Sequence, residues 1–280
     1  MEIALGALVA LAYGSGDFLG GISSKRLPTV TVLLVSQSFG LAGAVVLVVT
    51  LRDAPPPAHI FLLSAVSGVV LVIALGLLFR GLALGRMSIV APLSAIGGGV
   101  LPVVWGLLRG ERPSALALAG VGVALVAAAI VGGGAEHDPA AAISPRLEMA
   151  LGAGAGVGFG VVFILLAESS SGSGMWPVFI ARCVSVPLLA VVSVVLGRSP
   201  RVPRADIAPV AGAGLSDVGA NALVILAVRR GLLSLVAPVA SLYPATTVVL
   251  ARFVLHERIG RQRSAGLALG LVGLALIATR

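Results

Sequence analysis

The sequence predicts an all-α integral membrane protein with about ten transmembrane helices, arranged as two inverted five-helix repeats. Three observations support this prediction: an apolar composition, a series of helix-length apolar runs, and an internal repeat at one offset. The 280 residues are 58% hydrophobic and only 11% charged, and their mean hydropathy is +1.12. A soluble domain has about 45–50% apolar and about 25% charged residues. This chain has too few charged residues to cover a surface that faces water, so lipid must surround most of it.

Ten apolar runs have the length of a membrane-spanning helix, since a hydrocarbon core about 30 Å thick requires about 20 helical residues. Short charged or Pro-rich segments such as Arg52–Pro57 and Arg198–Arg204 separate these runs. The first run follows Glu2, not a basic segment, and lacks a convincing cleavage site, so we expect a retained helix and not a signal peptide. The predicted spans are residues 3–23, 29–51, 59–80, 87–108, 114–134, 148–168, 175–197, 206–228, 234–255 and 263–279.

An internal repeat aligns the two halves of the chain at a single offset of 146 residues. Residues 86–93 fall on residues 232–239, and both segments contain the pattern Ser-x-Val-Ala-Pro. Without a gap, Glu111-Arg112 then falls on Glu257-Arg258. Over residues 85–129, 13 of 45 positions are identical to their partners. Shared apolar composition would not place Pro, Glu-Arg and Gly in one ungapped register, so we infer a duplication.

The number of helices in each copy determines how the two copies are oriented. Because five is odd, two consecutive copies cross the membrane in opposite directions. The same offset also aligns the two starts, with residues 2–14 on residues 148–160. We therefore predict a first repeat at residues 1–134, a linker loop at 135–147 and a second repeat at 148–280. Inverted repeats are typical of secondary transporters, whose substrate site lies near mid-membrane at the repeat interface.

Basic residues in the predicted loops give one indication of membrane orientation. With an internal N-terminus, the loops place six Lys or Arg on the cytoplasmic side and eleven on the opposite side. The positive-inside rule then favours an external N-terminus.

The net charge of +8 predicts contact with anionic lipid headgroups and not with nucleic acid. Lys and Arg occur singly or in pairs between apolar runs, as expected of basic caps on membrane helices, and not along one polar face. Cys183 is the only cysteine, so no intrachain disulfide can form, and its apolar run predicts a small buried side chain. The sequence has no HExxH, Walker A or paired CxxC pattern, so we expect no metal site and no cofactor.

Both halves also share an ordered series of motifs. Gly85–Ala129 and Gly231–Ala275 each contain Ser-x-Val-Ala-Pro, a Pro-containing helix, Gly-Glu-Arg or His-Glu-Arg, and a Gly-rich last helix. This series resembles EamA domains, the repeated units of the drug/metabolite transporter superfamily. Tyr13–Phe18 is similar to the Trp-Gly-containing first helix of such units, with Tyr in place of Trp, and Phe159-Gly160 holds that place in the second half.

The resemblance implies a ten-helix bundle around a central cavity. It also implies movement of metabolites, amino acids or drugs, often outward and often coupled to protons. Such families are described with both termini in the cytoplasm, which conflicts with the charge count above.

Two aspartates lie inside predicted helices, where an ionisable group costs roughly 2.5–3.5 kcal/mol on insertion scales. Asp17 lies in the first helix with Tyr13 one turn away on the same face, and Asp217 lies midway along the eighth with Asn221 one turn on. Because burial disfavours the charged carboxylate, either aspartate could bind and release a proton during a transport cycle. Structural hydrogen bonds to backbone carbonyls or serines are the alternative for both.

Arg182 and several small polar residues complete the predicted site. Arg182 lies about two turns into the seventh helix, where it could pair with Asp17 or Asp217, hold a substrate carboxylate, or extend to the nearer interface. Prolines and glycines in the fourth and ninth helices can interrupt helical hydrogen bonds and expose backbone groups to a substrate, although glycine also permits close helix packing. The predicted cavity residues on these two helices are Ser94, Ser241, Tyr243 and Thr246.

Residues near the predicted helix ends are expected at the membrane interface or in loops. Trp105 and Trp176 fit an interfacial aromatic belt. Glu111-Arg112 and Glu257-Arg258 are expected to fix loop geometry at helix ends and not to bind substrate.

The sequence as a whole predicts a secondary active transporter and not an enzyme. We expect an exporter of small metabolites, such as amino acids, or of drugs, which works by alternating access and could couple to protons. It would be a multi-pass protein of a bacterial cell (plasma) membrane, with the lipid bilayer and a small-molecule substrate as partners and a homodimer left open.

Two alternatives stand beside this prediction. Gly14-Ser15-Gly16-Asp17 resembles the motif of intramembrane aspartyl proteases, with Asp217 as the second carboxylate of a dyad. Its place in the first helix is wrong for such proteases, and a single dyad leaves the duplication unexplained. The second alternative is a membrane scaffold that transports nothing.

Overall fold

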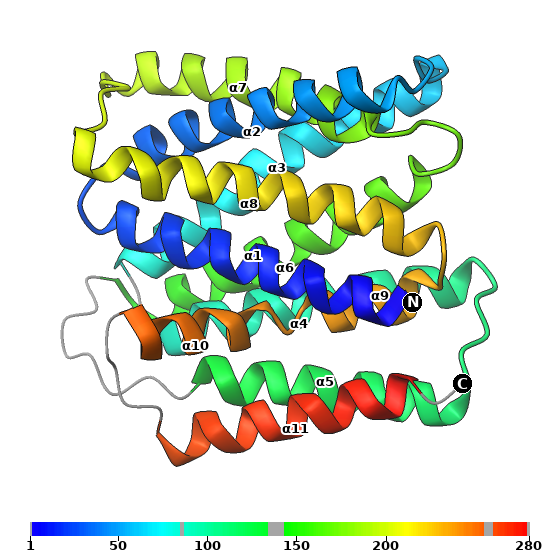
Figure 1. The fold of residues 1–280 in the computed structure, drawn as a ribbon. Helices are drawn as coiled ribbons and strands as arrows, with labels where there is room; N and C mark the ends of the chain where they lie inside the picture. Colours follow the sequence, from blue (N-terminus) through cyan, green and yellow to red (C-terminus); the bar gives the residue numbers. More distant parts are fainter. Residues whose placement is uncertain (1, 85–86, 134–142, 255–259, 279–280) are drawn as a thin grey trace.

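The computed structural model describes residues 2–84, 87–133, 143–254 and 260–278, and these residues form helices and no strand (Figure 1). The all-α prediction is thereby confirmed. Helices α9 and α10 are two pieces of one predicted span, so the described helices account for ten crossings. The helices are α1 (Glu2–Ser24), α2 (Thr29–Leu51), α3 (Ala58–Leu84), α4 (Met87–Leu108), α5 (Ala115–Gly133), α6 (Pro145–Glu168), α7 (Trp176–Val195), α8 (Arg204–Val228), α9 (Leu233–Ala240), α10 (Tyr243–Val254) and α11 (Arg261–Ala278).

The described helices have the apolar surface that a bilayer requires, and several of them have the length to cross it. Six described helices, α1, α2, α3, α6, α7 and α8, are long and apolar enough to cross a membrane. Large apolar side chains face outward, and Leu108, Val194 and Phe253 are 76%, 79% and 74% exposed. Outward apolar residues are stable where lipid is the solvent. Cys183 is also exposed, so its predicted burial is wrong, because α7 directs the adjacent Arg182 inward.

Helix packing follows the two-fold pattern that inverted repeats produce (Figure 1). Helix α1 packs on α8, and its counterpart α6 packs on α3, the counterpart of α8. Helix α2 contacts α8 in the same way that α7 contacts α3. The pairs α2–α7 and α5–α11 each join two counterparts directly. Exchanging the two sets of helices therefore preserves these contacts.

Loop contacts at the two ends of the bundle are also related by the repeat offset. The Asp53 carboxylate accepts a hydrogen bond from Met175 N at 3.1 Å, and its backbone oxygen accepts one from Trp176 Nε1 at 2.9 Å, at the start of α7. At the start of α2, Thr31 Oγ1 donates to the backbone oxygen of Ser199 at 2.9 Å. Because positions 53 and 199 differ by the repeat offset, corresponding loops bind the starts of corresponding helices.

The helix that precedes the last one differs between the halves. Helices α9 and α10 are separated at Ser241 and Leu242, as the prolines of this segment predict. Helix α4 is continuous, so the predicted interruption there is wrong. Its glycines serve packing instead, since a Cβ on Gly97 would lie 2.8 Å from the Cα of Gly156 in α6.

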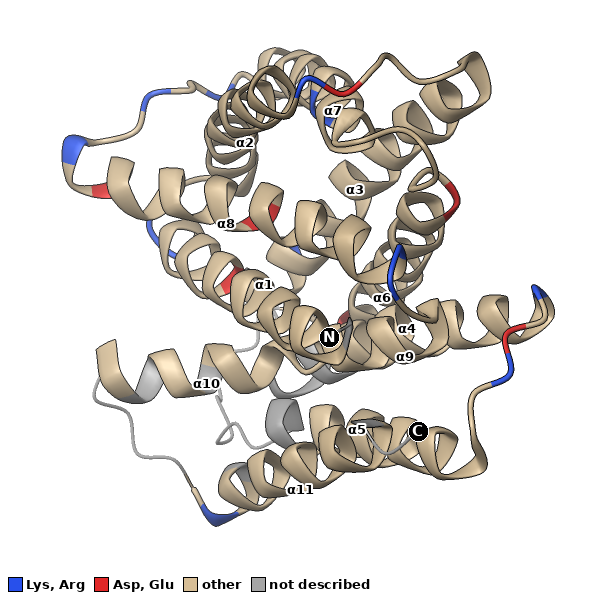
Figure 2. Cartoon of the chain, turned by 45° about the vertical axis from the view of Figure 1, so that its right-hand side comes forward, with Lys and Arg blue, Asp and Glu red and all other residues tan. Residues whose placement is uncertain are grey.

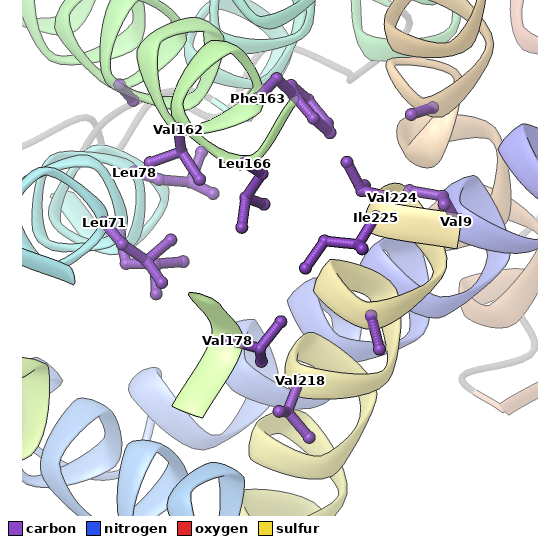
Figure 3. Packing of buried hydrophobic residues seen from close by; sticks show 14 of the residues in the cluster. Val9, Leu71, Leu78, Val162, Phe163, Leu166, Val178, Val218, Val224 and Ile225 are labelled. Atoms are coloured by element: carbon purple, nitrogen blue, oxygen red, sulfur yellow. The ribbon is translucent and has the colours of Figure 1, made fainter. Parts of the chain in front are cut away.

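An apolar core holds the central helices together (Figure 3). Buried side chains from α1, α3, α6, α7 and α8 meet there, among them Val9, Leu78, Leu166, Val178 and Ile225. Helix α1 begins at the same end of the bundle at which α11 ends (Figure 1). This arrangement agrees with an even number of crossings.

Candidate functional site

Charged residues divide into two groups by position in the fold. Most lie in the loops and at helix ends, whereas α1 and α8 each carry an acidic residue in the body of the helix (Figure 2). These are Asp17 and Asp217. Arg182 of α7 is buried near them, with 1% of its surface exposed. A buried charge of this kind requires a partner, so the surroundings of these three side chains define the candidate site.

Arg182 and Asp217 form a buried ion pair. One guanidinium nitrogen of Arg182, Nη2, donates to Oδ2 of the Asp217 carboxylate. The other terminal nitrogen, Nη1, donates to Gln37 Oε1 at 2.5 Å, and Gln37 Nε2 donates to Asp217 Oδ2 at 3.2 Å. Three side chains from α7, α8 and α2 thus close a ring of hydrogen bonds. Among the roles predicted for Arg182, the structure shows the ion pair with Asp217.

Asn221 and Tyr13 extend this network to α1. Asn221 Nδ2 donates to the backbone oxygen of Asp217 at 2.8 Å and to its Oδ1 at 3.3 Å, as expected for side chains one turn apart. Asn221 Oδ1 accepts a hydrogen bond from the Tyr13 hydroxyl at 2.9 Å. The Tyr13 ring contacts Phe163 edge to face, with centroids 5.9 Å apart. The polar network therefore joins helices of both predicted repeats.

Glycines make room for this network. A Cβ on Gly40 of α2 would lie 3.3 Å from Arg182 Nε, so a larger residue would press on the guanidinium. A Cβ on Gly214 would lie 1.8 Å from the backbone oxygen of Ser36, which shows how closely α8 approaches α2. The close approach brings Gln37 within reach of both Asp217 and Arg182.

Asp17 has a different environment from Asp217. Within the described part of the chain, its carboxylate has no hydrogen bond and no ion pair. It lines two small adjoining cavities together with Tyr13, Leu75 and Asp217. These cavities have volumes of about 30 and 20 Å³, close to the space that one water molecule needs. The larger one is also lined by Gly98, Phe159, Val162, Phe163, Ser241 and Tyr243, and the smaller one by Gly16, Leu33, Ser36, Gln37, Phe79 and Ala213.

Of the remaining predicted residues, Ser241 and Tyr243 line the larger cavity, and Ser94 and Thr246 contact neighbouring residues. The hydroxyls of Ser94 in α4 and Tyr243 in α10 are hydrogen-bonded at 2.6 Å. Ser241, at the break between α9 and α10, donates to the backbone oxygen of Ala237 at 2.9 Å. Thr246 donates to the backbone oxygen of Ala10 at 3.2 Å and is absent from the cavity lining, so it joins α10 to α1.

The glycines of the string Gly14-Ser15-Gly16-Asp17 have packing roles. A Cβ on Gly14 would lie 2.5 Å from the backbone oxygen of Tyr243, and one on Gly16 would lie 3.3 Å from that of Ala213. Both glycines therefore allow close contacts of α1 with neighbouring helices. Asp217 is bound to Arg182, Gln37 and Asn221, so it does not form a dyad that shares a proton with Asp17. The protease alternative is not supported.

A second polar cluster lies at the end of the bundle where α9 begins. Glu111, in the loop after α4, accepts hydrogen bonds from the backbone nitrogens of Leu233 and Ser234, both at 2.9 Å. This carboxylate satisfies free amides at a helix start, where negative charge is favourable. A Cβ on Gly106 would lie 2.4 Å from Glu111 Oε2, so glycine there makes room for the contact. The repeat-related Glu257-Arg258 lies outside the described residues.

Glu168 at the end of α6 belongs to the same cluster. It accepts hydrogen bonds from Trp105 Nε1 at 2.9 Å and from Arg109 Nη2 at 3.1 Å, both on or just after α4. A cavity of about 240 Å³ lies between these side chains and the start of α9. The cluster therefore joins the two halves at one end of the bundle.

Sequence reasoning missed Gln37 and the aromatic wall of the cavity. Gln37 lies in Ser36-Gln37-Ser38, a run of three polar residues within an otherwise apolar span, and this signal could have identified it. Phe159 is the repeat counterpart of Tyr13, and both line the larger cavity. The two cavities are lined by α1, α4, α8 and the segment from Ser241 to Tyr243, which carry most of the predicted site residues, and also by α2, α3 and α6.

Comparison with known proteins finds a family match in the second half of the chain. Residues 146–279 match the model of the EamA-like transporter family. A solved crystal structure matches 99% of this chain and 96% of its own chain, with a TM-score of 0.78 and 18% sequence identity, which shows a shared fold. No curated protein sequence matches the chain. Members of the EamA family are transporters and not enzymes. The family match covers slightly less than half of the chain and identifies an EamA-like domain in the second half of a multi-pass membrane protein.

Proposed function

We propose that this protein is a secondary active transporter that exports small metabolites, such as amino acids, or drugs across a bacterial plasma membrane. The observation that carries the proposal is the cavity between the two predicted repeats, which the Asp17 carboxylate lines without a hydrogen-bonding partner among the described residues. Inverted-repeat transporters bind their substrates at this location. Export is the direction that the resemblance to EamA domains implies.

The two aspartates have different roles in this proposal. Asp217 is held by Arg182, Gln37 and Asn221, so it anchors α8 to α7 and α2. Asp17 is free to exchange partners, and a carboxylate in an apolar cavity binds either a proton or a cationic group of the substrate. Competition between the two for one carboxylate would couple substrate export to proton entry.

Contacts at both ends of the bundle support an alternating-access cycle. At one end, Glu111 and Glu168 join the two halves. At the other end, Arg26 pairs with Asp206 at 3.4 Å and Thr31 bonds to the backbone of Ser199. Because the central cavities hold little more than water, substrate entry requires one of these ends to open. Exchange of the open end between two similar halves is the mechanism that inverted repeats permit.

The experiment that tests the function is transport by the purified protein in liposomes. With an imposed pH gradient, a panel of amino acids and cationic drugs is screened for flux, and we expect gradient-driven accumulation of at least one compound. Asp17→Asn removes the carboxylate for which proton and substrate compete, so it should abolish this accumulation. Lys25→Gln, which removes one charge from an exposed position outside the cavity, serves as the control and should transport normally.

Two outcomes would contradict the proposal. Absence of flux for every compound would favour the scaffold alternative. Peptide cleavage that is lost in both Asp17→Asn and Asp217→Asn would instead favour a protease. If Asp217→Asn transports normally and Asp17→Asn does not, the division of roles between the two aspartates is supported.

A further inference from the structure

A groove outside the central cavity combines arginines with an apolar wall. Its volume is about 470 Å³, and it lies where the loops after α4 and α8 meet α5, α9 and α11. We name it the arginine groove, and it is lined by Arg112, Pro113, Ser114, Ala117, Arg230, Gly231, Leu232, Leu235 and Ile277. No part of the transport proposal uses this groove.

The two arginines lie at the depth of lipid headgroups. Arg112 falls between the end of α4 at Leu108 and the start of α5 at Ala115. Arg230 falls in the same way between the end of α8 and the start of α9. Loops that connect membrane spans lie in the headgroup region, where Arg and Lys meet phosphate groups. The guanidinium groups are therefore at the level at which a phosphate would bind.

Arg112 and Arg230 lack the protein partners that two nearby arginines have. Arg109 pairs with Glu168, and Arg229 donates from Nε to the backbone oxygen of Ser170 at 2.6 Å. Within the described residues, neither Arg112 nor Arg230 has a carboxylate or carbonyl partner. Two positive side chains that line one groove repel each other unless an anion lies between them. This arrangement favours an anionic ligand.

The apolar wall distinguishes a lipid from a small anion. Ala117, Leu235 and Ile277 come from α5, α9 and α11 and are buried, so they give the groove an apolar floor. A free phosphate could contact only the arginines. An acyl chain would also contact the apolar part of the groove and bury apolar surface there.

From this combination we propose that the arginine groove binds an anionic phospholipid, with the phosphate between Arg112 and Arg230 and an acyl chain along the apolar wall. The start of α5 adds to the attraction, since Ser114 caps it and its free amides favour negative charge. Arg112 follows Glu111, and Leu232 precedes the residue that Glu111 binds. A bound lipid therefore strengthens the contact between the two halves at this end.

The test counts lipids bound to the purified protein by native mass spectrometry during titration with phosphatidylglycerol. Because each arginine near the surface contributes about 1 kcal/mol, Arg112→Gln/Arg230→Gln should weaken the first binding step by about 30-fold. Arg52→Gln/Arg201→Gln removes the same charge from exposed loop positions outside the groove, and its affinity should stay within about twofold of wild type. Arg112→Lys/Arg230→Lys, which keeps the charge, should retain most of the binding.

Further arms identify the ligand chemistry. Phosphatidylcholine should bind much more weakly than phosphatidylglycerol, and soluble glycerol phosphate should not compete with it. Equal affinity for the two lipids, or equal weakening in the groove and control variants, would overturn the proposal. Full competition by glycerol phosphate would assign the site to a free anion. These outcomes are independent of transport, so they leave the proposed function untouched.

Discussion

The central cavity has two sides that come from the same repeated positions and differ in chemistry. On one side, Asp17 and Asp217 supply carboxylates. Their counterparts at the repeat offset are Phe163 and Leu71, both buried in the apolar core (Figure 3). Asn221 likewise corresponds to Leu75. In the predicted duplication, divergence of these positions accounts for carboxylates in α1 and α8 and for apolar side chains at the matching positions of α6 and α3.

In the proposed transporter, this difference would let one cavity bind both the polar and the apolar part of an amphipathic substrate. If the counterparts of Asp17, Asp217 and Asn221 were also polar, six ionisable or amide groups would lie in the membrane, at a large cost in free energy. With one apolar side, the buried charge stays limited to a satisfied network and one carboxylate. An apolar wall of Phe159 and Phe163 also offers contact surface to the non-polar part of a substrate. If this division holds, Asp217 and Asp17 have separate roles, the first in stability and the second in transport.

The largest effect is expected for Arg182→Met. The substitution leaves the Asp217 carboxylate buried without its cationic partner, and breaking a buried ion pair in this way costs about 3–5 kcal/mol. The free energy of unfolding, measured by equilibrium denaturation in mixed micelles, should fall by this amount. Arg182→Met/Asp217→Asn removes the orphan charge and should recover at least half of the loss. An equal loss in both variants would show that the guanidinium contributes by packing alone.

A smaller effect is expected for Tyr13→Phe at the edge of the same network. It removes the hydrogen bond to Asn221 and retains the edge-to-face contact with Phe163. A lost hydrogen bond of this kind costs about 1 kcal/mol in the free energy of unfolding. Tyr243→Phe, which removes the bond to Ser94 on the other wall, provides the comparison for this measurement and should lose a similar amount. No loss in Tyr13→Phe would exclude the hydroxyl from the network that holds Asp217.

Sequence reasoning recovered the helices because span length and apolar character are local properties. The predicted span 206–228 corresponds to α8 at Arg204–Val228, and 29–51 matches α2. The break after α9 was also foreseen from its prolines. The continuity of α4 was not foreseen. Whether a glycine interrupts a helix or allows close packing depends on the neighbouring helix, and here Gly97 of α4 packs against Gly156 of α6.

The candidate site could be predicted only in part for a related reason. Ionisable residues within apolar runs are visible in the sequence, so Asp17, Asp217 and Arg182 were found. Which of them pair is decided by the approach of different helices. The bond of Gln37 to both Arg182 and Asp217 depends on the contact of α2 with α7 and α8, which no local pattern encodes.

The smallest effect on stability is expected for Asp17→Asn, although its effect on transport should be large. Asp17 has no hydrogen bond or ion pair among the described residues, so the neutral side chain of the same shape removes no favourable contact. The free energy of unfolding should change by less than about 1 kcal/mol. Asp217→Asn is the matched comparison, since the same chemical change weakens the bond to Arg182 and should destabilise the protein more. If the two variants lose equal stability, Asp17 also has a structural role. If Asp17→Asn is stable and has lost gradient-driven transport, the unpaired carboxylate serves the transport cycle and the paired one serves the fold.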